Sequence, residues 1–322
     1  MTEPGSALEG SAIGEAVRLL GGGPDEVRSA VAAIDSAASQ GDADALERQA
    51  VFEAMGCFRP PNWVRALDCL QAAADRGSRS AQAQLLVLAG QTDAANDWSR
   101  LRSQISMEQV VRAPGKTILS ETPRLRVMEG FASPAECTWL ISRARDRLRT
   151  ATVVNPTGSQ DVRAVRTNSA VEFQVPDMDL VVEAIRARIS AAINLPLPLF
   201  EPSQVLHYDP GQEFRAHCDN FDPQLPGHAD RLRHFGQRIA TVLIYLNDEY
   251  AGGETSFPRA GLSFRGKTGD ALFMANVDRA GHPDPSTLHA GTPPRSGEKW
   301  IFSQWVRDKV PQVDPAAGGV IW

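Results

Sequence analysis

The chain has 322 residues, of which 42% are hydrophobic and 22% charged, and its formal net charge is −6. A chain of this length and composition is typical of a globular protein with about two domains. The acidic balance, without any run of Lys or Arg, indicates no nucleic-acid partner. No stretch approaches the roughly 18 apolar residues of a membrane span, and the beginning of the chain lacks the basic and apolar regions of a signal peptide. We therefore expect no membrane partner either.

The cysteines predict a cytoplasmic protein. Cys57, Cys69, Cys137 and Cys218 show neither a C-x-x-C motif nor the dense spacing of a disulfide-stapled domain. Reduced thiols are the simplest interpretation, and they indicate a reducing compartment.

Residues 1–105 are expected to form an α-helical repeat domain. Their apolar residues recur with the helical period, and Gly stands where helices would end. The segment AIDSAASQGDADA (33–45) aligns without gaps with CLQAAADRGSRSA (69–81). Each unit is interpreted as a helix, a Gly turn and a second helix whose N-cap is Asp42 or Ser78.

This alignment resembles the SEL-type relatives of the tetratricopeptide repeats, whose period lies in the mid-thirties. The resemblance implies stacked helix pairs, so helices over 11–20 and 92–105 are expected to act as caps. It also implies a protein partner at the helical repeats, by analogy with such arrays. The alternative interpretation is a helical domain whose similar helices reflect an Ala-rich composition.

A linker is predicted at 106–118, where Pro and Gly interrupt the helical pattern. Beyond it, Ser133-Pro134-Ala135-Glu136 has the form of a capping box that begins a helix, and a second helix is expected from Asp177. The polar segment 222–236 is expected to form a loop.

From about residue 198 the sequence becomes rich in strand signals. β-Branched and apolar runs are separated by Gly and Pro turns, as in RIATVLIYL, ETSFP, GDALFMA and KWIFSQWVR. Many short strands with turn signals predict a double-sheet jelly roll. The predicted fold class is therefore α+β in two parts, an N-terminal α-helical repeat domain followed by a jelly-roll core.

His217-Cys218-Asp219, followed far along the chain by His289, has the form of a two-histidine, one-carboxylate metal site. Such a set occupies one face of an octahedron and leaves positions open, which suits non-haem Fe(II). In a strand, His217 and Asp219 would share a face and converge on one ion, with His289 supplied by another strand. Lys299 is placed to hold an acid that also touches the metal. A zinc hydrolase uses similar ligands with an open position, so this class stays open.

Between Glu201 and Trp300 the chain resembles the prolyl 4-hydroxylase-like branch of the Fe(II)- and 2-oxoglutarate-dependent dioxygenases. The resemblance rests on HYDPGQEFRAHCD, YLND, GGETSFP and LHAGTPPRSGEKW, which follow the order of that family's motifs. It implies that residues 119–322 form a dioxygenase domain. Its core would be a double-stranded β-helix, a form of jelly roll, with helices that buttress the outside.

The resemblance implies Fe(II) bound by His217, Asp219 and His289, with 2-oxoglutarate and O₂ as cosubstrates and ascorbate as a candidate reductant. The distal carboxylate of 2-oxoglutarate would pair with Lys299. Tyr208 stands where the family has a tyrosine that contacts 2-oxoglutarate. Thr241 is a further candidate for this pocket, because a hydroxyl at an inward strand position needs a partner.

The expected activity is hydroxylation of a C–H bond, most readily in a prolyl residue of a peptide or protein, with release of succinate and CO₂. The same chemistry on a free amino acid or another small molecule is the alternative. An alternative of another class is an interaction protein whose repeats bind a partner and whose β-core is a non-catalytic metal-binding scaffold.

Overall fold

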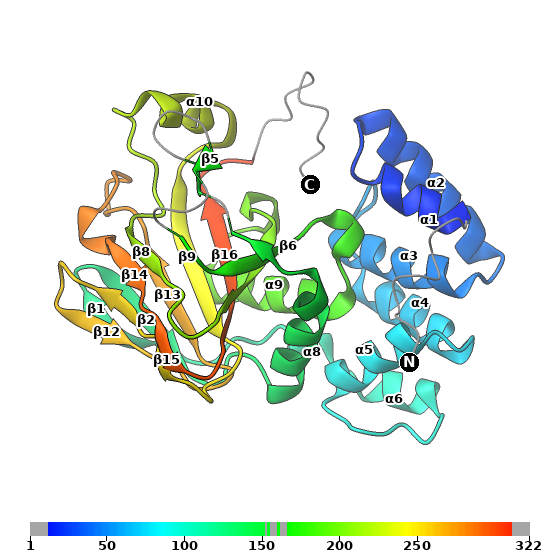
Figure 1. The fold of residues 1–322 in the computed structure, drawn as a ribbon. Coiled ribbons are helices and arrows are strands. Elements are labelled where there is room, and N and C mark those ends of the chain that lie inside the picture. Colours follow the sequence, from blue (N-terminus) through cyan, green and yellow to red (C-terminus); the bar gives the residue numbers. More distant parts are fainter. Residues whose placement is uncertain (1–11, 152, 155–159, 162–165, 311–322) are drawn as a thin grey trace. The chain divides into compact units, whose positions relative to one another are not determined.

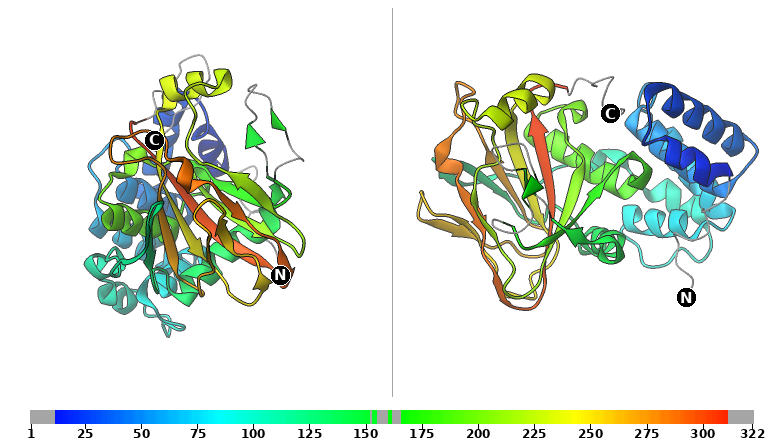
Figure 2. Two further views of the ribbon diagram at one scale, coloured as in Figure 1. Left: turned by 90° about the vertical axis from the view of Figure 1, so that its left-hand side faces the viewer. Right: turned by 45° about the horizontal axis from the view of Figure 1, so that its top comes forward.

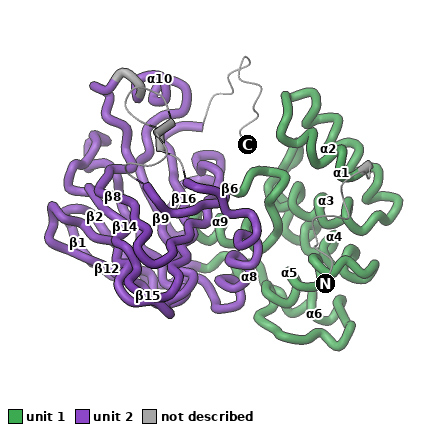
Figure 3. Tube along the Cα trace, viewed as in Figure 1, with its two compact units in different colours: residues 1–112, 173–191, 313–322 green, residues 113–172, 192–312 purple. Residues whose placement is uncertain are grey.

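The computed structural model describes residues 12–151, 153–154, 160–161 and 166–310 and shows an α+β chain (Figure 1). The ends of both expected domains, 1–11 and 311–322, lie outside the described residues. The chain divides into two compact units (Figure 3). Unit 1 comprises residues 1–112, 173–191 and 313–322, and unit 2 comprises residues 113–172 and 192–312. Residues 173–191 were expected in the dioxygenase domain, whereas they cluster with the N-terminal helices.

Unit 1 is built from helices. In chain order they are α1 (Ala12–Leu19), α2 (Pro24–Ser39), α3 (Ala43–Met55), α4 (Trp63–Asp75), α5 (Arg79–Ala89), α6 (Trp98–Gln104), α7 (Met107–Val110) and most of α9 (Leu180–Ile193). Their apolar faces supply a core rich in alanine and leucine. None of the helices described anywhere in the chain is long and apolar enough to cross a membrane.

The two aligned segments of unit 1 have the same turn. Gly41 and Gly77 adopt nearly equal left-handed φ angles of 85° and 88°, which residues with a Cβ rarely adopt. The next residue, Asp42 or Ser78, caps the following helix by accepting the backbone N–H three residues on, at 2.8 and 3.1 Å. A repeated helix pair needs such equivalent turns, while its assignment to the SEL-type family stays a prediction.

Unit 2 contains an eight-stranded sheet with the order β1-β2-β13-β9-β16-β7-β6-β3. Its strands are β1 (Thr117–Glu121), β2 (Arg124–Met128), β3 (Arg149–Thr150), β6 (Ser169–Phe173), β7 (Ser203–Tyr208), β9 (Arg238–Tyr245), β13 (Ala271–Ala275) and β16 (Lys299–Arg307). Strands β9 and β16 lie at its centre, and every residue of β16 is buried. The continuous apolar runs seen in the sequence therefore form the central strands.

A second sheet has the order β12-β11-β14-β8. Its strands are β8 (Phe214–His217), β11 (Thr255–Phe257), β12 (Leu262–Phe264) and β14 (His289–Gly291). Figures 1 and 2 show it as a layer facing part of the large sheet. Buried side chains from both sheets form one core, with Leu206 and Ile301 from the large sheet and Phe214 and Phe257 from the small one. Two short pairs complete the described strands: β10 (Ala251–Gly252) with β15 (Pro294–Ser296), and β4 (Val153–Val154) with β5 (Gln160–Asp161).

Helix α8 (Pro134–Ala144) begins as the capping box predicts. Ser133 Oγ accepts the N–H of Glu136, and a Glu136 carboxylate oxygen accepts the N–H of Ser133. Two other predictions were wrong. The helix expected from Asp177 begins at Leu180, because Asp177 ends a 3₁₀ turn. The loop expected at 222–236 contains helix α10 (Pro226–Phe235).

Candidate metal centre

The three predicted metal ligands meet at the small sheet. His217 ends β8, Asp219 lies two residues further, and His289 begins β14 directly opposite His217 in the ladder. His217 Nε2 lies 3.5 Å from one Asp219 oxygen, and His289 Nε2 lies 3.8 Å from the other. Ligands bound at about 2.0–2.2 Å to a common ion are roughly 3–4 Å apart. The set therefore has the spacing to hold one divalent ion.

Each imidazole is oriented by its other ring nitrogen. His217 Nδ1 lies 2.8 Å from the carbonyl oxygen of Arg215, and His289 Nδ1 lies 2.9 Å from that of Thr287. A carbonyl accepts only from an N–H, so both Nε2 atoms carry the lone pair in the neutral rings. The Phe214 ring stacks on His217 with 3.5 Å between centroids, which limits rotation of that imidazole.

A residue of β9 holds the carboxylate of Asp219 by a hydrogen bond. The hydroxyl of Thr241 donates to Asp219 Oδ2 at 2.6 Å, and Asn276 Nδ2 donates in turn to the Thr241 hydroxyl at 2.9 Å. All three side chains are buried. Thr241, expected in the 2-oxoglutarate pocket, thus reaches the site through Asp219. Asn276 gave no signal in the sequence, because its role depends on the pairing of β13 with β9.

The protonation states suit metal binding. Burial raises the pKa of Asp219, but the neighbouring imidazoles of His289 and His217 outweigh the effect of burial and hold this pKa well below its usual range. Burial, followed by the charge of His217, lowers the pKa of His289 to about 4. At neutral pH the carboxylate is ionised and the His289 imidazole is neutral, as metal ligands must be.

Lys299 and Tyr208 lie opposite each other on β16 and β7. The Lys299 side chain is 2% exposed, and its Nζ lies 4.9 Å from the centre of the Tyr208 ring. Burial lowers the pKa of Lys299 to about 7, which Glu254 offsets only in part, and burial raises the pKa of Tyr208 to about 12. Among the described residues no carboxylate forms an ion pair with Lys299. A bound dicarboxylate would supply the missing negative charge.

A small cavity of about 30 Å³ joins these groups. It is lined by the three candidate ligands, by Tyr208 and Lys299, and by residues that the sequence analysis missed, among them Thr255, Ser303 and Trp305. Lys299, Ile301, Ser303 and Trp305 are alternate residues of β16, so strand alternation from Lys299 is the signal that would have found them.

Two arginines, the partly buried Arg238 and the buried Arg166, contact aromatic residues that line this cavity. Arg238 donates twice to Glu201, at 2.6 and 2.7 Å, and its guanidinium lies 3.7 Å from the centre of the Trp305 ring. Arg166 lies over the Phe214 ring at 4.6 Å, and its Nη2 has no hydrogen-bond partner in the described part of the chain. No role is predicted for Arg166 from the sequence, because Asn168 interrupts the Arg-Thr-Ser stretch of the family that residues 166–169 resemble.

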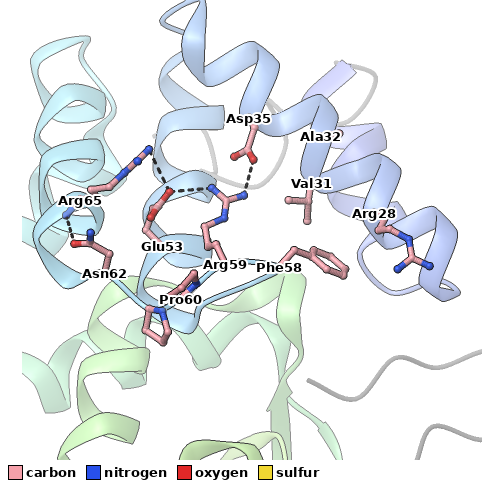
Figure 4. A pocket seen from close by; sticks show the side chains of 11 residues that line it. Arg28, Val31, Ala32, Asp35, Glu53, Phe58, Arg59, Pro60, Asn62 and Arg65 are labelled. Atoms are coloured by element: carbon pink, nitrogen blue, oxygen red, sulfur yellow. Dashed lines mark hydrogen bonds and ion pairs between the residues drawn. The ribbon is translucent and has the colours of Figure 1, made fainter.

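A larger cavity, of about 760 Å³, lies in unit 1 beside the segment that joins α3 and α4 (Figure 4). Charged groups that line it form ion pairs with one another: the Arg59 guanidinium lies 2.5 Å from an Asp35 oxygen and 2.8 Å from a Glu53 oxygen. Within the described residues, this cavity is not lined by any group of three metal-binding side chains. The groups suited to metal-dependent chemistry therefore lie at the smaller cavity.

Comparison with known proteins gives a consistent result. Residues 203–307 match the 2OG-Fe(II) oxygenase superfamily. Prolyl 4-hydroxylase 1 of Arabidopsis thaliana is 36% identical over 211 residues, which are 60% of this chain and 71% of that protein. Prolyl 4-hydroxylase 5 of the same plant is 38% identical over 209 residues, 58% of this chain and 69% of the other. The viral collagen prolyl hydroxylase of Paramecium Bursaria Chlorella virus-1, in its 2OG complex, is 29% identical with a TM-score of 0.44, covering 56% of this chain and 94% of that one.

The chain is thus a metal-dependent oxygenase, and it belongs to the 2OG-Fe(II) oxygenase superfamily, with prolyl 4-hydroxylases as its relatives. It is a 2-oxoglutarate-dependent dioxygenase that uses Fe(II), 2-oxoglutarate and O₂. The predicted family, enzyme class and these cofactors are confirmed, and a zinc hydrolase or a non-catalytic scaffold is not supported. A role for ascorbate stays a prediction.

Proposed function

We propose that this enzyme hydroxylates prolyl residues in a peptide or protein substrate, with release of succinate and CO₂. The observation that carries the proposal is the meeting of His217, Asp219 and His289 beside the buried cation of Lys299. The names of its relatives, which are prolyl 4-hydroxylases, support a prolyl substrate.

His217, Asp219 and His289 are assigned as the ligands of Fe(II). Two imidazoles and one carboxylate leave open the positions that a chelating cosubstrate and O₂ require. When bound, the iron with 2-oxoglutarate and O₂ supplies the oxidising chemistry. The chain supplies orientation: the carbonyl contacts fix both rings, and Thr241 fixes the carboxylate.

Lys299 and Tyr208 are assigned to 2-oxoglutarate. The protonated Lys299 would pair with the distal carboxylate, and the Tyr208 hydroxyl would donate a second hydrogen bond. Gly291 favours this arrangement, because a Cβ at that position would lie only 3.1 Å from the Tyr208 hydroxyl oxygen and would crowd it.

The finer architecture belongs to the same proposal. The facing antiparallel sheets support a double-stranded β-helix for unit 2, and the equivalent turns at Gly41 and Gly77 support helical repeats in unit 1. Repeats of this type would offer a surface to a protein partner. All four cysteines are free, which supports the expected cytoplasmic location.

The first test of the cofactor assignment is anaerobic titration of the Fe(II)-loaded protein with 2-oxoglutarate. We expect a visible metal-to-ligand charge-transfer band that is lost in His217→Ala and kept in His282→Ala, since the His282 side chain is exposed and is not part of the ligand group. No band with confirmed Fe(II) loading would contradict the ligand assignment.

The test of the substrate is incubation with proline-containing peptides and with free proline. We expect one succinate to be released for each hydroxylated prolyl residue. Mass spectrometry of the peptide counts the hydroxylated residues. Turnover of free proline or another small molecule, without turnover of any peptide, would favour the small-molecule alternative.

A further inference from the structure

A second group of metal-binding side chains lies where β7 ends and β16 begins, on residues next to Tyr208 and Lys299. His207 precedes Tyr208 on β7, and Glu298 immediately precedes Lys299 and the start of β16. Because side chains alternate along a strand, His207 faces away from the small cavity that Tyr208 lines. Asp209 follows the end of β7. One ligand atom from each of His207, Asp209 and Glu298 lies within 4.8 Å of the others.

The imidazole of His207 is the unusual member of this group. Its side chain is only 8% exposed, and its Nε2 is buried without a hydrogen-bond partner in the described part of the chain. That atom lies 3.6 Å from Glu298 Oε2 and 3.8 Å from Asp209 Oδ1. Both distances are too long for hydrogen bonds, and an unpartnered buried nitrogen costs about 1–3 kcal/mol. His207 Nε2 thus lies near two carboxylates without bonding to either.

The distances are those of ligands that share one ion. Ligands held at about 2.1 Å by a tetrahedral ion are roughly 3.4 Å apart, so small side-chain movements would close the group. One ligand is buried and fixed by packing, since the His207 ring lies 4.3 Å from the Trp300 ring. The Asp209 side chain is 54% exposed, which gives an ion and its water ligands access from solvent.

The charge of the group also favours a cation. In the described part of the chain, Glu298 forms an ion pair with Arg145, whose guanidinium is half exposed and lies 3.3 Å from Glu298 Oε2, and Asp209 forms none with an arginine or lysine. Burial lowers the pKa of His207, although Asp209 and Glu298 oppose this shift. The imidazole is therefore disposed to stay neutral at pH 7, so a proton is a poor counter-charge and the ring nitrogen is available as a ligand.

We propose that His207, Asp209 and Glu298 form a second divalent-metal site, separate from the Fe(II) centre. One imidazole nitrogen and two carboxylate oxygens suit a borderline ion such as Zn²⁺, Mn²⁺ or Co²⁺, with water in the remaining positions. Because His207 and Trp300 are paired in the β7–β16 ladder, an ion here ties the two strands at the pair next to Tyr208 and Lys299.

The test counts Co²⁺ ions on the metal-free full-length chain by equilibrium dialysis and elemental analysis. The native chain is expected to bind two ions. His217→Ala should retain the second site and bind one, whereas His207→Phe should retain the Fe(II) centre and also bind one. Phenylalanine keeps a ring against Trp300. The double variant should bind none.

The matched control is His282→Phe. His282 Nδ1 lies 3.5 Å from Asp278 Oδ2, a histidine–carboxylate pair of similar spacing without the second carboxylate. This variant should still bind two ions. Glu298→Gln, which keeps an acceptor for the Trp300 indole N–H, and Asp209→Asn should each weaken the second site at least about tenfold.

One ion on the native chain that His217→Ala removes would overturn the proposal, as would two ions on His207→Phe. If circular dichroism shows that His207→Phe does not fold, Asp209→Asn tests the proposal instead, because the Asp209 side chain is exposed. Unchanged Co²⁺ affinity at both sites of Asp209→Asn would overturn the second site. A single ion that depends on His207 and not on His217 would uphold the second site while contradicting the Fe(II) ligands proposed above.

Discussion

At the scale of single residues, Lys299 carries a large desolvation penalty that the proposed binding of 2-oxoglutarate explains. Burial brings its pKa from the ordinary 10.5 to about 7, and Glu254 offsets the effect only in part. Without a partner, a buried ammonium destabilises the folded chain. In the proposed assignment the distal carboxylate of 2-oxoglutarate would supply that partner, so the free enzyme would carry the penalty and the complex would relieve it.

Affinity for 2-oxoglutarate is expected to fall as pH rises through about 7, by up to tenfold per pH unit, because free Lys299 loses its proton and binding must restore it. The KM for 2-oxoglutarate between pH 6 and 9 measures this. Lys299→Arg keeps its charge over the whole range and should flatten the profile. A native KM that does not change with pH would contradict the role of Lys299.

Lys299→Met is expected to stabilise the fold while abolishing binding of 2-oxoglutarate. The folded-state pKa of Lys299 lies below the unfolded value, so unfolding takes up a proton between about pH 7 and 10.5, and native stability rises with pH in that window. The gain in the free energy of unfolding should be about 1–4 kcal/mol at pH 6 and smaller at pH 9. Urea unfolding at both pH values measures it, and a variant less stable than the native chain at pH 6 would be evidence against a penalty.

Thr241 holds Asp219, one of the proposed Fe(II) ligands. Thr241→Val removes the 2.6 Å hydrogen bond that orients the carboxylate, so the affinity for Fe(II) should fall about 10- to 100-fold with the fold retained. Thr255→Val is the control, because its buried hydroxyl bonds to Tyr245 and not to a ligand. Equal metal affinities of the two variants would show that Thr241 has no role in orienting Asp219.

At the scale of elements, prediction succeeded where the local signal was complete. Helix α8 has its capping box, and β9, β13 and β16 are apolar runs of strand length. Helix α10 was missed because its N-cap, Leu225, offers no side-chain acceptor and its residues are mostly polar, so neither start signal nor apolar stripe is present. Helix α9 begins later than expected because Asp179, not Asp177, accepts the N–H of Val182.

Gly269 fixes the turn that leads into β13. Its φ is +88°, its N–H donates to the Tyr245 carbonyl, and a Cβ there would collide with the carbonyl oxygen of Ala132. Gly269→Ala should therefore lower the free energy of unfolding by more than about 2 kcal/mol. Gly281→Ala, with a φ of +86° and open space around the Cβ, isolates the backbone strain and should lose only about 1 kcal/mol. Equal losses in urea unfolding would rule out the collision.

At the scale of the whole molecule, the proposed metal ligands and Lys299 are confined to one unit. His217, Asp219, His289 and Lys299 all fall within residues 192–312. A ligand that binds only the folded state stabilises what it binds, by about 2.7 kcal/mol at a hundredfold excess over its dissociation constant. Calorimetry of the full chain can measure this stabilisation, with Mn²⁺ in place of Fe(II) so that no turnover occurs.

We expect calorimetry of the full chain to show two transitions, because two compact units need not unfold together. Mn²⁺ with 2-oxoglutarate should raise the melting temperature of one transition by several degrees and leave the other nearly unchanged. The His217→Ala variant should show no shift. A single transition, or an equal shift of both, would indicate that the units unfold as one.

The sequence by itself determined the candidate metal-binding residues, the candidates Lys299 and Tyr208 for 2-oxoglutarate, the central strands and the capped helix. These are encoded locally, by spacing, by the period of two in strands and by the order of motifs. Only the tertiary structure decided that Thr241 holds Asp219, that residues 173–191 join the helical unit, and that His207 meets Glu298. Such contacts depend on the register of strands far apart in the chain, and a pattern of single residues does not specify that register.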